Sequence, residues 1–281
     1  MVGPDAGRNS RAKPPFSLRT GIGDKTDAMM TMAAMREAAA STGEGLRRRA
    51  RLAREPQPQG VRSPPLRFLL DELRLLLGRR RAEAVPVAPA RAPVPVMILP
   101  GFGAHPARLN GMARALEQAG HLVFDWGLGF NLGPTPANFA FMLARVQRIA
   151  RATGRPVALV GWSLGGLYAR EVAKLAPEAV ARVITMGTPF SGDPRANNAW
   201  RAYQVITGLS VDDPPVGSGN LAIKPPVPTI ALWSPRDGVI APRCACGWPG
   251  ERDRAVALRC SHLGFATSAE AIRAVLAELD A

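Results

Sequence analysis

Short apolar segments alternate with helical patterns over the last two-thirds of the chain. From Val94 onward the apolar segments are VPVMIL, HLVFDW, PVALVGW, VARVITMG, VPTIALWS and AVALRC. Helical spacing of apolar residues is found between them, over Ala107–Ala119, Pro136–Ala152 and Leu164–Leu175, and again over Ser268–Leu279. Apolar strands that alternate with helices are typical of a parallel sheet covered on both faces. The sequence therefore predicts one α/β domain over residues 95–281, with a mostly parallel, doubly wound sheet of about six strands.

An amphipathic helix is predicted just before this domain. In PLRFLLDELRLLLGRRR, residues 65–81, leucines recur at helical spacing while charged residues fall largely on other faces. Two interpretations are open. The leucine face packs on the domain, or the helix, residues 66–81, lies in a membrane interface with its arginines near anionic headgroups. A stiff Pro/Ala linker follows, so residues 64–94 are interpreted as helix plus linker.

Residues 1–63 are rich in arginine and proline and are predicted to form a mostly disordered tail, with one possible helix within 28–54. The net charge of the chain is +14. Half of the 36 basic residues, but only 9 of the 22 acidic ones, precede Pro95. Nearly all the positive charge is arginine spread along the chain, with no zinc-finger spacing and no aromatic RNA-binding box. Nucleic-acid binding is therefore not expected.

The cysteines and the N-terminal sequence bear on the compartment. The spacing of the three cysteines is not that of a disulfide framework: Cys244, Cys246 and Cys260. Two alternatives are open, a single disulfide from Cys244 or Cys246 to Cys260 in an oxidising compartment, or three thiols in a reducing one. The first thirty residues lack the apolar core of a secretory signal. The uncharged run over 126–144 is broken by glycine and proline, so we interpret it as a loop leading into a helix. The expected location is cytoplasmic, with a membrane-peripheral position left open by the leucine helix.

A serine between glycines stands where the third apolar segment ends. In VALVGWSLGGLYAR, Ser163 follows the predicted strand and precedes a predicted helix. Glycines at 161, 165 and 166 let a strand turn sharply into a helix without side-chain collisions. Such a turn lifts the serine Oγ above the sheet, which is the nucleophile-elbow arrangement. An ordinary turn is the alternative interpretation.

Two further residues follow predicted strands in the order that a Ser-Asp-His triad requires. Asp237 comes just after the fifth apolar segment and His262 just after the sixth. The carboxyl ends of parallel strands share one edge of the sheet, where ligands bind. Of the other histidines, His121 opens a strand at the opposite edge, and His105 is expected to be a loop or cap residue. We therefore predict Ser163 as nucleophile, His262 as base and Asp237 as the acid that orients the base.

Acyl transfer at a serine also needs backbone donors for the developing oxyanion. Leu164 opens a helix directly after the serine, so its N–H lies at the positive end of the helix. The second donor is expected to be Phe102 in ILPGFGAHP, where flanking glycines let the backbone turn inward; a plain glycine turn is the alternative. Trp126, Trp162 and Phe190 are candidates for an apolar substrate pocket, although single aromatic residues are often packing residues.

These motifs resemble the α/β-hydrolase superfamily, in its lipase- and esterase-like branch. The motifs that carry the resemblance are PGFG (100–103), GWSLGG (161–166), MGTPFSG (186–192), SPRDGVI (234–240) and SHLGF (261–265). MGTPFSG resembles the Thr-Pro-His-x-Gly segment of bacterial lipases, with Phe190 in place of the histidine. WGLGFNLGP (126–134) is similar to a block in uncharacterised bacterial members. The resemblance covers about residues 95–281. It implies an α/β-hydrolase fold without its first two antiparallel strands, and residues 190–226 stand where such proteins often have a lid. Two interpretations are open for the apolar residues of this segment, as the lining of an acyl pocket or as ordinary core: Trp200, Tyr203, Val205, Ile206 and Leu209.

The predicted activity is hydrolysis of carboxylic esters through an acyl-enzyme, with a small-molecule or lipid ester as substrate. This chemistry requires no metal or organic cofactor, and the sequence holds no obvious cluster of metal ligands. The same triad suits a thioesterase, an amidase or an acyltransferase. An alternative from another class is a non-catalytic protein of the hydrolase fold, with a membrane-surface or scaffolding role carried by the tail and the leucine helix.

Overall fold

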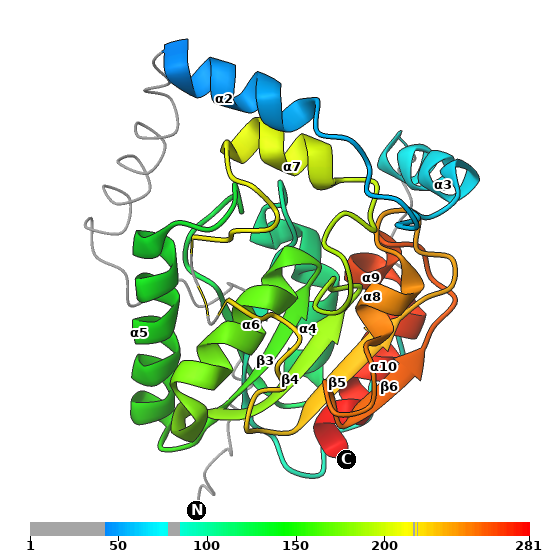
Figure 1. The fold of residues 1–281 in the computed structure, drawn as a ribbon. Helices are drawn as coiled ribbons and strands as arrows, with labels where there is room; N and C mark the ends of the chain where they lie inside the picture. Colours follow the sequence, from blue (N-terminus) through cyan, green and yellow to red (C-terminus); the bar gives the residue numbers. More distant parts are fainter. Residues whose placement is uncertain (1–42, 78–84, 216, 218) are drawn as a thin grey trace, which may run out of the picture.

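The computed structural model describes residues 43–77, 85–215, 217 and 219–281. Its centre is a six-stranded sheet, parallel throughout, with strand order β2-β1-β3-β4-β5-β6 (Figure 1). The strands are β1 (Pro95–Leu99), β2 (Leu122–Asp125), β3 (Val157–Trp162), β4 (Val180–Met186), β5 (Thr229–Trp233) and β6 (Arg254–Ala257). Each apolar segment of the sequence coincides with one of them, with β6 beginning one residue before its segment, so the predicted α/β fold is confirmed.

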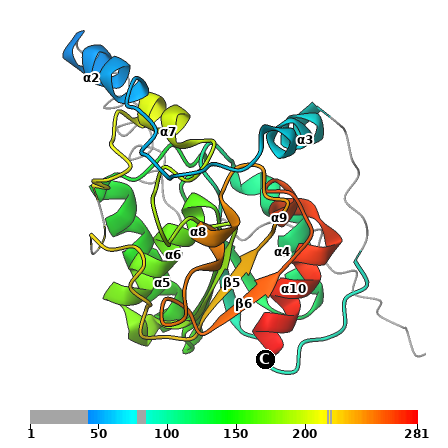
Figure 2. The same ribbon diagram turned by 45° about the vertical axis from the view of Figure 1, so that its right-hand side comes forward.

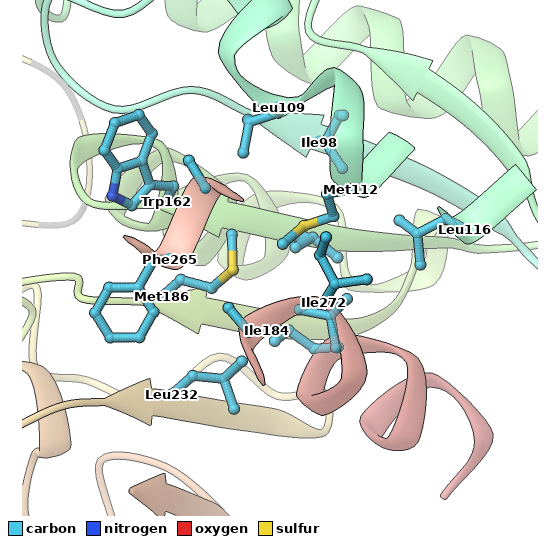
Figure 3. Close-up of a cluster of buried hydrophobic side chains, with 14 of the residues drawn as sticks. Ile98, Leu109, Met112, Leu116, Trp162, Ile184, Met186, Leu232, Phe265 and Ile272 are labelled. Carbon is cyan, nitrogen blue, oxygen red and sulfur yellow. The ribbon is translucent and has the colours of Figure 1, made fainter. Parts of the chain in front are cut away.

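Helices cover both faces of this sheet (Figures 1 and 2). One face carries α5 (Pro136–Thr153) and α6 (Leu164–Leu175); the other carries η1 (Pro106–Leu109), α4 (Asn110–Gln118), α9 (Gly264–Thr267) and α10 (Ala269–Asp280). Successive side chains of a strand point to opposite faces, so Met97 packs under α5 and α6 while Ile98 packs on the other side. Figure 3 shows this second cluster, with Met112 of α4 and Ile272 of α10 against Ile98 and Ile184.

Local signals explain why the helix boundaries were readable from the sequence. The Thr135 hydroxyl accepts a hydrogen bond from the Asn138 N–H (3.0 Å) where α5 begins, and Gly154 ends that helix in the left-handed conformation (φ 66°). Ser268 caps α10 in the same way, accepting from the Ala271 N–H at 3.2 Å. The predicted helix over 107–119 begins as the 3₁₀ turn η1 and continues as α4.

The carboxyl ends of the strands form the upper edge of the sheet in Figure 1. Two helices in long connections lie at this edge: α7 (Trp200–Thr207) and α8 (Pro242–Cys246). Helix α7 belongs to the segment 190–226 that the sequence places at the position of a lid. Its amphipathic pattern was not recognised there because the helix is short and lies between stretches rich in Asn, Gly and Pro.

The segment before the sheet has contacts that the sequence did not suggest. Helix α2 (Gly43–Ala53) packs on α7, and the chain then crosses the same edge to α3 (Leu66–Leu77) (Figures 1 and 2). The Gln57 side chain donates to the Arg195 carbonyl at 3.0 Å and accepts from Trp200 Nε1 at 3.1 Å. Ser63 Oγ donates to the Asn197 carbonyl at 3.0 Å. The rest of the predicted tail, residues 1–42, and the arginines at 79–81 lie outside the described residues.

The three cysteines are free thiols. Cys244 and Cys260 are buried, and burial raises the pKa of the first to about 11 and of the second to about 12. Cys246 is half-buried. None of the helices within the described ranges combines the length and the apolarity needed to cross a bilayer.

Candidate active site

Ser163 occupies the turn between β3 and α6 in a strained backbone conformation. Its φ of 53° and ψ of −121° make it the only non-glycine residue with positive φ among the described residues. The Ser163 N–H donates to the Met186 carbonyl at 2.8 Å, and its carbonyl accepts from the Gly166 N–H and the Thr188 hydroxyl, each at 3.0 Å. These bonds hold the residue in a geometry that it would otherwise avoid, which is a feature of functional turns.

The glycines around Ser163 are needed for close backbone approach. A Cβ at position 161 would lie 2.4 Å from Gly166 Cα, and one at position 165 would lie 2.4 Å from the Leu99 carbonyl oxygen. Both distances are too short for any side chain. The start of α6 is therefore pressed against the ends of β1 and β3, and the predicted sharp strand-to-helix turn is what the structure contains.

Asp237 and His262 are buried and in direct contact. Asp237 Oδ2 lies 2.8 Å from His262 Nδ1. Its other oxygen, Oδ1, accepts from the backbone N–H groups of Val239 (2.8 Å) and Ile240 (2.7 Å), which fixes the carboxylate plane. Burial opposes protonation of His262, but the charge and hydrogen bond of Asp237 outweigh it, so the pKa of His262 is raised. With its proton on Nδ1, the neutral ring has an unprotonated Nε2, which is the tautomer that a general base needs.

Trp162 links the nucleophile strand to the histidine loop. Its Nε1 donates to the His262 carbonyl at 3.1 Å, and the two ring centroids are 5.8 Å apart. No hydrogen bond joins Ser163 Oγ to His262 within the described residues. The structure thus brings acid and base together, places the serine at the same sheet edge, and leaves the serine–histidine contact unmade. In unliganded sites such contacts often tighten only with substrate.

The two predicted oxyanion donors flank Ser163. Leu164 is the first residue of α6, so its N–H has no partner within the helix. The loop holding Phe102 lies against the serine, since a Cβ on Gly101 would be 3.2 Å from Ser163 Cβ. The Phe102 N–H makes no hydrogen bond to any described residue. Both amides are therefore available to a ligand.

Residues 94–205 match the family described as the alpha/beta hydrolase fold, a range that includes β1, β3 and Ser163. The chain has the α/β-hydrolase fold. A Bacillus licheniformis lipase in its propeptide form has the same fold, with a TM-score of 0.52 and 17% identity over 72% of this chain and 54% of that one. Asp237 and His262 lie beyond the matched range, so their assignment rests on position and geometry.

Two lipases match a short part of this α/β-hydrolase chain more closely. Triacylglycerol lipases of Pseudarthrobacter phenanthrenivorans and Burkholderia plantarii are each 47% identical over 57 residues. That stretch is 20% of this chain, 18% of the first lipase and 16% of the second. The match thus spans less than a fifth of the length of either relative.

An apolar pocket of about 120 Å³ opens beside Ser163. Helix α7 contributes Trp200 and Tyr203 to its wall, and the Tyr203 ring meets Phe102 edge-on with centroids 5.3 Å apart. Its other lining residues include Leu167, Tyr168, Val211 and Ile240. The cavity is similar in size to one of ~150 Å³ that holds a benzene molecule.

Trp126, Trp162 and Phe190, which the sequence suggested for this pocket, are not among the residues that line it. Trp126 is fully buried and stacks on Tyr168 with centroids 6.1 Å apart. Trp162 belongs to the cluster between the sheet, α4 and α10 (Figure 3). Phe190 is buried beneath the Arg170 guanidinium, 4.1 Å from the ring centroid. In this structure all three are packing residues. The aromatic residues of the pocket come from α7, from α6 (Tyr168) and from the Phe102 loop.

The two other histidines take the places that the sequence suggested. His105 caps η1, its Nδ1 accepting from the Ala107 N–H at 3.2 Å. His121 is buried before β2, its Nδ1 accepting from the Val94 N–H at 3.1 Å, at the opposite edge from Ser163. Neither contributes to the site.

Three supporting residues were not recognised in the sequence. Asn131 is buried and donates from Nδ2 to the Pro100 carbonyl at 2.8 Å, which steadies the Phe102 loop. The Thr188 hydroxyl binds the Ser163 carbonyl, as described above. Both lie within motifs that the sequence singled out, so their motifs were a usable signal. The third, Glu72, lies in α3, where nothing in the sequence pointed to the active site.

Proposed function

We propose that this protein is a serine hydrolase of carboxylic esters. The observation that carries the proposal is the buried Asp237–His262 pair, joined at 2.8 Å, at the sheet edge where Ser163 sits in an elbow with positive φ. A serine hydroxyl becomes nucleophilic when an oriented base removes its proton. A buried aspartate on Nδ1 supplies that orientation and stabilises the imidazolium that forms.

The steps follow from these positions. Ser163 Oγ attacks the acyl carbon while His262 Nε2 takes the hydroxyl proton. The carbonyl oxygen becomes an oxyanion held by the Phe102 and Leu164 amides, each donor typically contributing about 2.7–4 kcal/mol. The imidazolium then protonates the leaving alcohol, which departs and leaves an acyl-enzyme. Water, deprotonated by His262, attacks that ester and releases the acid and the free serine.

The pocket supports an apolar acyl or aryl group on the substrate. Its lining is mostly aliphatic and aromatic, and Ser163 is one of the lining residues. The other polar residues of the lining are Glu171, Asn197 and Ser210. The lipase relatives, described as triacylglycerol lipases, agree with a lipid or small-molecule ester. A thioester fits the same geometry, because the triad and oxyanion donors do not distinguish the leaving atom. Helix α7 of the proposed lid segment covers this pocket, so movement of α7 would govern substrate entry.

Labelling with a fluorophosphonate probe, followed by peptide mapping, tests the proposal without knowledge of the substrate. We expect a single adduct on Ser163 of the wild-type protein. The adduct should disappear in Ser163→Ala and be strongly reduced in His262→Ala. Ser191→Ala, at a buried serine of the neighbouring loop, serves as the matched control and should label normally.

The outcomes separate the competing functions. An adduct on Ser163 that depends on His262 would justify a screen of esters, thioesters, amides and acyl acceptors. Protein that is folded by circular dichroism but forms no adduct would refute the hydrolase proposal. It would favour the non-catalytic alternative.

We further propose that α3 contacts an anionic bilayer surface. Leu66, Leu70 and Leu73 lie on one side of this helix and are 69%, 54% and 48% exposed. Arg67 and Arg74, also exposed, stand beside them. Exposed leucines flanked by arginines are typical of helices that lie in a membrane interface. Arg74 is paired with Asp71, so the positive charge of Arg67 is what favours anionic over zwitterionic headgroups.

Vesicle sedimentation tests this contact. We expect binding to vesicles containing phosphatidylglycerol, weaker binding to pure phosphatidylcholine, and loss of both in a Leu66→Ser, Leu70→Ser, Leu73→Ser variant. A control with Leu175→Ser, an exposed leucine at the end of α6, should bind normally. Equal sedimentation of the triple variant and the wild type would refute the proposal. A concentration-dependent dimer that the triple change abolishes would instead assign the leucine face to a second copy of the chain.

A further inference from the structure

Glu72 is a buried carboxylate with an unusual set of partners. It lies on α3, outside the range that matches the hydrolase family, and its side chain is only 2% exposed. Oε1 accepts from the backbone N–H groups of Gly238, at 3.2 Å, and of His262. Oε2 accepts from the Leu263 N–H at 2.9 Å. One side chain therefore binds the residue that follows the candidate acid, the candidate base itself, and the residue after it.

The chemistry of these contacts requires a carboxylate. All three partners are donors and both oxygens of Glu72 are used, so each oxygen must act as an acceptor. A glutamine amide would turn an N–H group toward a backbone N–H, and an alanine would leave all three donors unpaired. Hydrogen bonds from backbone amides to a charged oxygen are among the stronger ones in proteins. Because Asp237 and His262 sit on separate loops, after β5 and β6, a bridge between the loops fixes the spacing of the pair.

Gly238 provides a second, independent sign that α3 is built into the site. A Cβ at this position would lie 2.5 Å from the Phe68 carbonyl carbon and 2.7 Å from the Leu69 nitrogen. Gly238 is not in the left-handed region, so its lack of a side chain serves the close approach of α3 and not a turn. The segment just before α3 is also bonded to the Gly238 loop. Asn198 Nδ2 donates to both the Pro64 and Gly238 carbonyls, at 3.1 and 2.8 Å.

We infer that Glu72 is a positioning residue, which locks the Asp237 and His262 loops together and so makes the N-terminal helix α3 a required part of the active site. The inference rests on the proposed serine hydrolase function. It deepens that function by assigning the alignment of the base to a residue contributed from outside the range that matches the hydrolase family. The negative charge of Glu72 also adds to the effect of Asp237, which raises the pKa of His262 against its burial.

The test compares Glu72→Gln with Asp71→Asn. The control removes a carboxylate from the same helix, but Asp71 is exposed and pairs only with Arg74 (2.8 Å) among the described residues. We expect Glu72→Gln to lower the rate of fluorophosphonate labelling of Ser163 by roughly 10- to 100-fold, the scale of an ångström-sized misplacement. Asp71→Asn should label at the wild-type rate.

A histidine titration by NMR distinguishes positioning from a general loss of stability. The chain has three histidines, so the His262 signal is readily assigned with single-site variants. In Glu72→Gln the pKa of His262 should fall, because a nearby negative charge is lost; in Asp71→Asn it should not move. This measurement needs no substrate. A wild-type protein that fails to label would therefore refute the hydrolase function while the titration still reports on Glu72.

A second variant covers the case in which Glu72→Gln does not fold. Gly238→Ala leaves every hydrogen-bonding side chain in place but forces α3 away from the loop, so it should slow labelling and lower the pKa of His262 in the same way. Hydrogen exchange in the wild-type protein adds a check without any variant, since the His262 and Leu263 amides should exchange slowly. Wild-type labelling and titration in either folded variant, or rapid exchange of both amides, would overturn the inference.

Discussion

Replacement of Asn131 by alanine gives the sharpest test of how the oxyanion loop is held. Asn131 is fully buried. Its Nδ2 donates to the Pro100 carbonyl at 2.8 Å, and its Oδ1 accepts from the Gly133 N–H at 3.3 Å. Truncation leaves a buried acceptor and a buried donor unpaired, at about 1–3 kcal/mol for each group. We expect the free energy of unfolding to fall by about 2–6 kcal/mol, which is within the total stability of most domains.

The same change should slow the chemistry more than it weakens binding. Pro100 precedes the loop that carries the Phe102 amide, and that amide is needed mainly when charge develops on the substrate oxygen. Loss of one oxyanion donor lowers kcat by about 10²–10³-fold, which sets the upper limit for a displaced Phe102. We therefore expect Asn131→Ala to lower kcat by up to about 10²-fold while KM stays within a few-fold.

Urea unfolding and ester kinetics on the folded variant measure the two effects separately. Asn138→Ala is the matched control, because the Asn138 side chain makes no hydrogen bond to any described residue. Asn138→Ala should change neither the free energy of unfolding nor kcat appreciably. A folded Asn131→Ala protein with wild-type stability would refute the role of this side chain as an anchor. Lost stability with wild-type kcat would show that Phe102 is held by other contacts.

Three further changes test other parts of the site. Asp237→Asn should lower kcat by roughly 10⁴-fold. In the wild type, kcat/KM should rise with pH as His262 loses its proton, with the midpoint above its ordinary value of 6.5 because its pKa is raised; the Asp237 variant should move the midpoint down. Gly165→Ala places a methyl group 2.4 Å from the Leu99 carbonyl oxygen. The clash should lower the free energy of unfolding by about 1–3 kcal/mol, measured by thermal unfolding, and should abolish labelling of Ser163 by the fluorophosphonate probe. With a thiol reagent at pH 8, Cys246 should react first, since burial raises the pKa values of the two other thiols.

Much of the central fold was predictable because its signals are local. Strands buried on both faces appear as unbroken apolar segments. Helix starts are indicated by N-cap residues such as Thr135 and Ser268. The candidate triad was predictable for the same reason. In a parallel sheet, a residue just after a strand must lie at the carboxyl edge, so sequence order alone placed Ser163, Asp237 and His262 at one edge.

The pocket was less predictable because it depends on which segments meet across the sheet edge. Trp126 and Trp162 adjoin the motifs in sequence, but their side chains point into the layers between sheet and helices. Tyr203 and Trp200 line the pocket, one of the two places that the sequence allowed for them. The choice between pocket and core depends on how α7 packs across the sheet edge, which is a long-range arrangement. The path of residues 55–63 across the sheet edge could not be predicted for a similar reason. It is fixed by hydrogen bonds from single side chains, such as Gln57, to backbone that is distant in sequence.

The orientation of α3 shows why hydrophobic periodicity was insufficient there. The leucine pattern favours packing of the leucine face, yet Leu66, Leu70 and Leu73 point to solvent while Glu72 is buried. Burying a leucine gains about 1.5–3 kcal/mol. Turning the helix over would leave the N–H groups of Gly238, His262 and Leu263 without their acceptor, at about 1–3 kcal/mol each, and would abolish three charge-assisted bonds. The two sets of terms are of similar size, so periodicity alone cannot choose between the orientations. The backbone donors of the Asp237 and His262 loops decide the orientation, and the three leucines are left exposed.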